Sequence, residues 1–193
     1  MEPIGPGDAL LVVDVQRDFL PGGALAVPDG AAVIPVLSNY CALFHSKGLP
    51  IIVTRDWHPP DHCSFRQQGG SWPTHCVAET PGAQFPEELQ PLPSTIVISK
   101  GTDPKREAYS GFQDTVLHQY LQSCGIRRLF IGGLATDYCV LQTVRDARAL
   151  GYAVTLLLDA VRAVNLHPED GQKAETEMMR LGALTLRYGQ LAA

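Results

Sequence analysis

The stretch LFIGGLATDYCVL, residues 129–141, joins an apolar run to a glycine pair and then to a segment with helical character. A strand that ends in a glycine turn and opens a helix leaves backbone N–H groups pointing at open space. Cys139 is expected in the first turn of the helix that begins after Thr136, where partial positive charge favours thiolate over thiol. The stretch therefore predicts a nucleophilic cysteine. The alternative is a buried structural cysteine beside an ordinary threonine N-cap.

Strands and helices alternate on both sides of this stretch. Apolar runs predict six strands, at residues 9–13, 51–54, 95–99, 128–131, 154–158 and 184–186. Helical patterns lie at residues 31–46, 112–124, 137–150 and 168–181. This alternation is typical of βαβ units with right-handed crossovers. We therefore expect an α/β fold, a three-layer α/β/α sandwich with a mainly parallel, roughly six-stranded, Rossmann-like sheet, with residues 1–193 forming a single domain.

Composition limits the class of protein. The 193 residues carry a net charge of −5 and no basic run, which argues against nucleic acid or an anionic membrane as the main partner. No apolar run approaches the ~20 residues needed to cross a bilayer, and the N-terminus lacks the basic region of a signal peptide. Five scattered cysteines without a CxxC pair favour a reducing, cytoplasmic compartment. The sequence leaves the oligomeric state open, a homo-oligomer included.

The predicted strands deliver polar groups to one edge of the sheet. In open parallel sheets the site lies outside the carboxyl ends of the strands. The candidates at this edge are Asp14, Asp56, Lys100, the turn that contains Cys139, and Asp159.

Three of these candidates suit covalent catalysis. A thiolate needs a positive neighbour, which Lys100 could supply, and a carboxylate that accepts the thiol proton and later passes it to a leaving amine. Asp14 directly follows the apolar run at residues 9–13, so its carboxylate is expected to be desolvated and its pKa raised. The alternatives are that Asp14 caps the following loop and that Lys100 is a solvated strand end.

The long loop after the second strand predicts a metal site. In a strand-like Asp-x-His, residues 56 and 58 point the same way, so Asp56 and His58 could bind one divalent ion, with His75 from across the loop. Three protein ligands leave open positions for water or substrate. The rival is a closed structural zinc site, with ligands drawn from His58, His62, Cys63, His75 and Cys76.

Aromatic residues lie in loops rather than at periodic core positions. These aromatic residues are Phe19, Trp57, Trp72 and Tyr109. Large rings at a strand-edge site commonly line a pocket for a flat ligand. The alternative is that each ring anchors its own loop.

Together these residues resemble the nicotinamidase (pyrazinamidase) family of isochorismatase-like cysteine hydrolases. The resemblance rests on six pieces in the family's order: DVQRDFLPGGALAV at 14–27, RDWHPPDHCSF at 55–65, WPTHCV at 72–77, SKGTDP at 99–104, YSGF at 109–112 and GLATDYCV at 133–140. They span nearly the whole chain, and no single piece would be specific.

The resemblance implies roles for individual residues. Asp14, Lys100 and Cys139 match the family's catalytic triad. Asp56, His58 and His75 match its divalent-metal ligands, with His62 as a candidate fourth ligand. The metal could be zinc, iron(II) or manganese(II).

The resemblance also implies a pocket and an oxyanion site. Phe19 and Trp72 fall where members sandwich a pyridine ring, and Tyr109 is a further pocket residue. Leu134-Ala135 falls where the family has a cis peptide, which would aim the Ala135 and Cys139 N–H groups as an oxyanion hole. Tyr138 occupies a variable position and is expected to leave the chemistry untouched.

The implied activity is an amidohydrolase that converts nicotinamide to nicotinate and ammonia through a Cys139 thioester, and pyrazinamide to pyrazinoate. Within the superfamily the main alternative is a cysteine hydrolase acting on another small amide. A second enzyme alternative is a metal-water hydrolase in which Cys139 is incidental, and a non-enzyme alternative is a sensor of pyridine metabolites.

Overall fold

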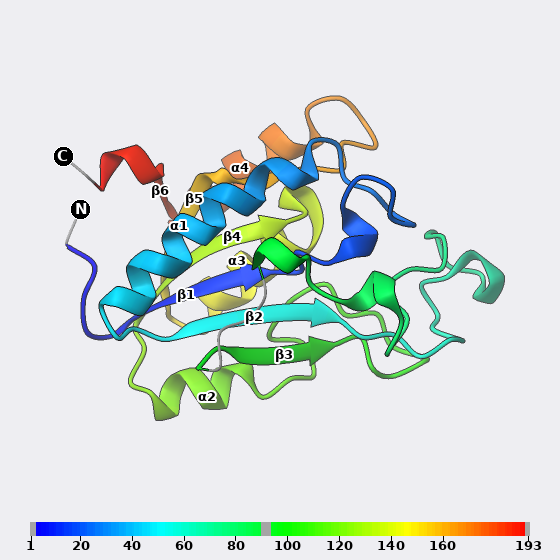
Figure 1. Cartoon of the computed structure of the whole chain (residues 1–193), viewed down its shortest axis with the longest axis horizontal. Coiled ribbons are helices and arrows are strands. Elements are labelled where there is room, and N and C mark those ends of the chain that lie inside the picture. The colour runs from blue at the N-terminus through cyan, green and yellow to red at the C-terminus, as the bar shows by residue number, and fades with distance from the viewer. Residues whose placement is uncertain (1–2, 90–93, 192–193) are drawn as a thin grey trace.

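A computed structural model describes residues 3–89 and 94–191, and a six-stranded parallel sheet forms its centre (Figure 1). The strands are β1 (Asp8–Val13), β2 (Ile51–Asp56), β3 (Ile96–Lys100), β4 (Arg128–Leu134), β5 (Ala153–Arg162) and β6 (Leu184–Leu186). The α-helices are α1 (Val33–Ser46), α2 (Leu117–Ser123), α3 (Leu141–Ala149) and α4 (Asp170–Arg180). All adjacent strand pairs are parallel, so the predicted α/β sandwich is confirmed.

The two faces of the sheet carry separate hydrophobic cores. Side chains alternate along β1, so Leu10 and Val12 face α1 and pack in one cluster with Leu37. Leu11 faces the other way and shares a second cluster with Val144 of α3 and with residues of α2 and α4. In Figure 1, α1 crosses the near face of the sheet while α3 lies behind it. The sheet is therefore buried on both faces, as its nearly continuous apolar strands predict.

The strand order creates one point where the chain direction across the sheet reverses. The order is β3-β2-β1-β4-β5-β6, so β1 has β2 on one side and β4 on the other. Val13 pairs with Gly133 there, and a Cβ on Gly133 would lie 2.1 Å from the Val13 carbonyl oxygen. Gly133 also has a φ of +121°, so only glycine suits this approach. The segments after β1 and β4 therefore leave the sheet side by side at the position where ligands bind in such folds.

β4 and β5 extend furthest beyond their predicted ends. β4 continues to Leu134 and β5 to Arg162, because a register shift after Ile131 lets Gly133 pair with Val161. Asp159 consequently lies inside β5 rather than at its end, and its predicted place at the site is wrong.

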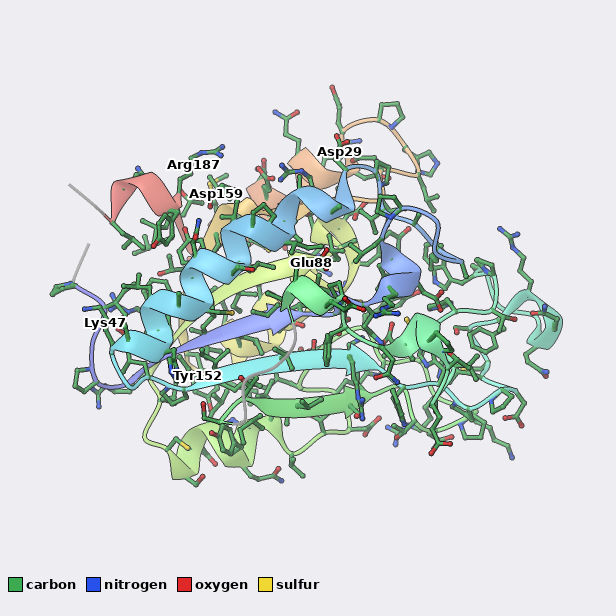
Figure 2. All side chains as sticks on the ribbon, in the orientation of Figure 1. Asp29, Lys47, Glu88, Tyr152, Asp159 and Arg187 are labelled. Carbon is green, nitrogen blue, oxygen red and sulfur yellow. The ribbon has the colours of Figure 1, made fainter. Side chains whose placement is uncertain are left out.

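Asp159 serves the α1 face instead (Figure 2). Its carboxylate accepts hydrogen bonds from the Tyr40 hydroxyl at 3.3 Å and the Tyr188 backbone N–H at 2.8 Å. It ties the C-terminal turn to α1.

The helix predicted at residues 112–124 begins only at Leu117. Local side chains occupy the backbone before it: Ser110 Oγ accepts from the Phe112 N–H, and the Thr115 hydroxyl donates to the Gly111 carbonyl. Such bonds compete with the helical pattern.

The connection from β2 to β3 has only short 3-10 turns in its described part, Arg66–Gln68, Pro81–Ala83 and Glu87–Leu89. Its first part extends beyond the carboxyl end of the sheet, at the right of Figure 1, whereas the turn at Glu87–Leu89 lies against α1, where the Ser38 hydroxyl donates to the Glu88 carbonyl. Within residues 3–89 and 94–191, no helix combines the length and apolar character required to cross a membrane.

Candidate active site

Lys100 lies at the centre of a buried polar cluster. Its side chain is buried, and Nζ lies 2.8 Å from Asp14 Oδ2 and 2.5 Å from Asp56 Oδ1. The ammonium also donates to the Ala108 carbonyl at 3.0 Å and lies 3.5 Å from Cys139 Sγ. The ends of β1, β2 and β3 and the turn after β4 thus bring the predicted base, cation and nucleophile together.

Burial and charge set the protonation of this cluster. Burial raises the pKa of Asp14, while Lys100 and the hydrogen bond from the Thr54 hydroxyl, 2.6 Å long, oppose that rise. Burial alone would lower the pKa of Lys100, but Asp14 and Asp56 raise it well above its ordinary value. The lysine is therefore a fixed cation between two carboxylates, and its charge occupies the space among Asp14, Asp56 and Cys139.

Cys139 differs from the expectation in two ways. Residues Thr136–Val140 form a π-helical turn that precedes α3, so the thiol does not lie in the first turn of an α-helix. Burial raises the pKa of the Cys139 thiol well above its ordinary value, although Lys100 works in the opposite direction. The resting nucleophile is therefore a neutral thiol that needs a base. Asp14 is available, because its carboxylate lies within 4.8 Å of the sulfur.

Three ligand atoms converge beside the lysine. Asp56, His58 and His75 offer donor atoms within 4.8 Å of one another, and all three side chains are buried. The Nδ1 atoms of His58 and His75 each lie 2.8 Å from a backbone carbonyl, those of Gly101 and Pro73 respectively. A carbonyl accepts only, so each Nδ1 carries the proton and each Nε2 presents a lone pair. The donor set suits a divalent metal ion.

The charges of these ligands also suit a cation. Burial alone would raise the pKa of Asp56, but Lys100 and His58 bring it below its usual range. Burial lowers the pKa of His75, which favours the neutral imidazole that a metal requires. For His58, burial is outweighed by Asp56, which raises the pKa, so this ring would have to give up a proton when a metal ion binds.

His62 lies next to this group without joining it. Its ring stacks on that of His58, with the centroids 4.0 Å apart. Its Nδ1 lies 2.7 Å from Ser64 Oγ and its Nε2 lies 3.1 Å from the Arg106 carbonyl, so both nitrogens have protein partners. In this arrangement His62 packs on His58 with both ring nitrogens engaged, and its role as a fourth ligand stays a prediction. Cys63 and Cys76 are likewise outside the ligand group of the described residues, which does not match a closed zinc site.

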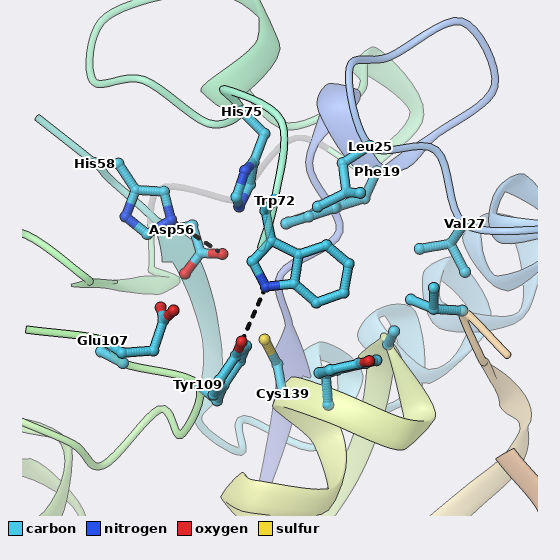
Figure 3. Close-up of a pocket in the computed structure, with 14 residues that line it drawn as sticks. Phe19, Leu25, Val27, Asp56, His58, Trp72, His75, Glu107, Tyr109 and Cys139 are labelled. Atoms are coloured by element: carbon cyan, nitrogen blue, oxygen red, sulfur yellow. Dashed lines mark hydrogen bonds and ion pairs between the residues drawn. The ribbon is translucent and has the colours of Figure 1, made fainter. Parts of the chain in front are cut away.

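A pocket opens between the ligand group and Cys139 (Figure 3). Its walls are mostly apolar and aromatic: Phe19, Leu25, Val27, Asp56, His58, Trp72, His75, Glu107, Ala108, Tyr109, Ala135, Tyr138, Cys139 and Val164. Trp72 Nε1 donates to the Tyr109 hydroxyl at 2.9 Å, which fixes the indole over the sulfur side of the pocket. Phe19, Trp72 and Tyr109 thus all line it.

One of the four loop aromatic residues lies outside the pocket, and one further aromatic residue lines it. Trp57 is not a pocket residue: the Arg55 guanidinium lies 3.6 Å from its ring centroid, and the ring packs against the core on the α1 side. Tyr138, which we expected to be neutral for the chemistry, lines the pocket and packs nearly perpendicular to Trp72 at 5.1 Å.

The peptide between Leu134 and Ala135 is cis, as the family resemblance implies. Ala135 lines the pocket next to the sulfur. Its carbonyl accepts from the N–H groups of Tyr138 and Val140, both at 3.1 Å.

Sequence reasoning missed several residues of the site. Thr54 and Gln16 are fully buried polar residues: the Thr54 hydroxyl donates to the Asp14 carboxylate, and the Gln16 amide bonds to the backbone of Asp56. The available signal was a polar side chain within or just after an apolar strand, which needs a partner when buried. Glu107 lines the pocket from the polar loop before Tyr109.

Comparisons with known proteins identify relatives over nearly the whole chain. The Isochorismatase domain profile matches residues 8–188. A curated nicotinamidase of Escherichia coli is 40% identical, with 92% of this chain and 93% of that protein covered.

Two solved structures are similar over nearly their full length. The pyrazinamidase of Pyrococcus horikoshii in complex with zinc is 48% identical with a TM-score of 0.91, covering 95% of this chain and 100% of that one. PnC1 of L. infantum in complex with nicotinate is 34% identical with a TM-score of 0.89, covering 98% of this chain and 96% of that one. With the profile match and these relatives together, the chain belongs to the isochorismatase-domain family and, within it, groups with the nicotinamidases and pyrazinamidases.

Proposed function

We propose that the protein is an amidohydrolase that converts nicotinamide to nicotinate and ammonia, and pyrazinamide to pyrazinoate. The observation that carries the proposal is the buried Lys100 ammonium, which contacts Cys139, Asp14 and the metal-ligand carboxylate of Asp56 at once. A thiol, a base and a cation next to an aromatic pocket suit acyl transfer from a flat aromatic amide.

The covalent steps follow from the positions of these groups. Asp14 accepts the thiol proton while Lys100 stabilises the thiolate, which attacks the carboxamide carbon. The oxyanion accepts hydrogen bonds from the Ala135 and Cys139 N–H groups. Asp14 returns the proton to the amine, ammonia leaves, and a thioester remains on Cys139. Water then attacks the thioester carbon and gives a proton to Asp14. The C–S bond breaks, the carboxylate product leaves, and Asp14 returns its proton to the Cys139 thiolate, which restores the thiol.

Asp56, His58 and His75 would hold a divalent metal ion next to this centre. When bound, such an ion offers a Lewis-acid contact that orients the pyridine nitrogen of the substrate. We propose zinc, because carboxylate with two imidazoles suits it and the P. horikoshii relative holds zinc. Trp72, held by Tyr109, and Phe19 would flank the ring.

The test measures ammonia release from nicotinamide by wild type, Cys139→Ala and Cys124→Ala. We expect Cys139→Ala to lose at least about 10⁴-fold in rate and to keep its metal, because the residual catalysis comes only from binding. Cys124 is exposed, so its variant is the matched control and should remain fully active. Activity retained by Cys139→Ala would contradict the covalent scheme and favour a metal-water hydrolase.

A substrate panel distinguishes the remaining alternatives. Nicotinamide and pyrazinamide should be hydrolysed faster than benzamide, which lacks a ring nitrogen, and faster than a carbamoyl amide. A preference for the carbamoyl compound would favour another amidase of the same superfamily. Nicotinamide binding without ammonia release would identify a sensor.

A further inference from the structure

The segment after β1 bonds to the site through alternate polar side chains. Asp14, Gln16 and Asp18 lie two residues apart in the sequence: Asp14 and Gln16 bond to Thr54 and Asp56 of β2, and Asp18 bonds to Cys76 in the long connection to β3. The role of Asp14 toward Lys100 is described above. The other two side chains hold the backbone of the proposed metal ligands.

Gln16 holds Asp56 from both sides of its peptide backbone. The Gln16 side chain is fully buried. Its Oε1 accepts from the Asp56 N–H at 2.7 Å, and its Nε2 donates to the Asp56 carbonyl at 2.8 Å and to the Ala83 carbonyl at 2.9 Å. The amide therefore acts like a neighbouring strand for the last residue of β2. It uses both donors and an acceptor, so the direction of the Asp56 side chain is fixed where it leaves the sheet.

Asp18 holds the other arm of the ligand group. Its Oδ2 accepts from the Cys76 N–H at 2.7 Å, and its Oδ1 accepts from the Ala24 N–H at 3.2 Å. Cys76 directly follows His75 and has a φ of +46°, a bend that a non-glycine residue keeps only when its surroundings fix it. A Cβ on Gly82 would lie 2.2 Å from the Asp18 carboxylate, so a glycine makes room for this contact.

We propose that Gln16 and Asp18 are positioning residues that set the metal affinity of the site, Gln16 through Asp56 and Asp18 through His75. The inference rests on the metal site of the proposed function and deepens it. Ligand atoms must lie within about 0.2 Å of their ideal distances, so residues that orient the ligands contribute to affinity without touching the ion. Loss of such a partner typically weakens metal binding by about 10–100-fold.

The test titrates the metal-free full chain with Zn²⁺ in competition with a chromogenic chelator. Gln16→Leu removes all three hydrogen bonds at similar volume, and Gln16→Glu keeps the acceptor but turns an oxygen toward two carbonyls. Both should bind zinc about 10–100-fold more weakly. Asp18→Ala should lose as much zinc affinity as the Gln16 variants. Asp18→Asn keeps one acceptor oxygen and should lose less affinity. Excess zinc should restore kcat in the variants that retain the fold.

Asp8→Asn is the matched control. Asp8 lies at the opposite end of β1 and accepts two hydrogen bonds from the Arg128 guanidinium, at 2.8 and 2.6 Å. The substitution should lower the free energy of unfolding and leave zinc affinity unchanged. Should Gln16→Leu fail to fold, Gln16→Glu and Asp18→Asn carry the test.

Zinc affinities within twofold of wild type in the folded Gln16 and Asp18 variants would overturn the inference. Wild type that binds no zinc would overturn the metal part of the proposed function as well, so the two failures are distinguishable without measuring activity.

Discussion

A buried carboxylate accepts a proton from a thiol only when its environment balances its charged and neutral forms. At Asp14, burial favours the neutral form, whereas Lys100 and Thr54 favour the charged form. Cys139 experiences the same burial, which keeps its thiol protonated at rest. The Asp14 carboxyl and the Cys139 thiol therefore both have raised pKa values next to the same cation, Lys100. Proton transfer from the thiol to the carboxylate is then not strongly unfavourable.

Replacing Thr54 by valine tests this balance. The Thr54 hydroxyl stabilises the Asp14 carboxylate, so its loss should raise the pKa of Asp14 further. The base form is lost as pH falls through that pKa. The acid limb of the kcat/KM profile should therefore move to higher pH, by about one unit.

Thr155→Val is the control for Thr54→Val. Thr155 is a buried threonine whose hydroxyl has no hydrogen-bond partner among the described residues. Its variant should keep the wild-type pH profile. An unchanged acid limb in Thr54→Val would mean that Asp14 is not the titrating base.

The hydrogen bond from Trp72 to Tyr109 gives a second prediction for a single residue. Tyr109→Phe removes the acceptor and frees the indole, and one such bond is worth about 1 kcal/mol. We expect KM for nicotinamide to rise about fivefold with little change in kcat, since the ring wall lies away from the reacting bond. Tyr120→Phe on α2 should change neither constant. A fall in kcat at constant KM would instead give Tyr109 a part in the chemistry.

Among the elements, β1 and β4 constrain the site through a close backbone contact. Gly133→Ala would place a methyl group against the Val13 carbonyl in a backbone conformation that alanine rarely adopts. We expect a loss of about 3 kcal/mol or more in the free energy of unfolding, measured with urea. Gly151 also has a positive φ, but nothing lies within 4 Å of an added Cβ. Gly151→Ala should cost only about 1 kcal/mol, and equal losses would contradict the steric argument.

The elements also separate what the sequence could predict from what it could not. Strands of a buried parallel sheet are nearly continuous apolar runs, so local hydropathy is enough to locate β1, β2 and β3. The polar residues after these runs then identify Asp14, Asp56 and Lys100. The extension of β5 through Asp159 depends on a register shift with β4, which no local pattern encodes. The roles of Gln16 and Thr54 depend on partners about 40 residues away. The neutral state of Cys139 follows from burial by the whole site rather than from its own turn.

For the whole molecule, the metal should contribute to stability. Its proposed ligands come from the end of β2 and from the long connection to β3, so a bound ion would join a loop to the sheet. At a metal concentration about 1,000 times the dissociation constant, binding adds about 4 kcal/mol. Chelation should lower Tm by about 10 °C and abolish ammonia release, with both restored by added zinc. A Tm unchanged by chelation, with zinc binding intact, would show that the loop is held without the ion.

The position of β3 in the sheet has a consequence for how the molecule loses activity. Among the described strands, β3 pairs only with β2, so it is an edge strand, yet its last residue is Lys100. Edge strands open locally at lower free energy than central ones, and their amide protons exchange faster with solvent. Fraying of this one strand would withdraw the cation from the thiol and from both carboxylates, while the second core would lose only the contacts of Ile96 and Ile98. We expect warming to cause a reversible loss of ammonia release at temperatures where the circular dichroism spectrum is still that of the folded protein.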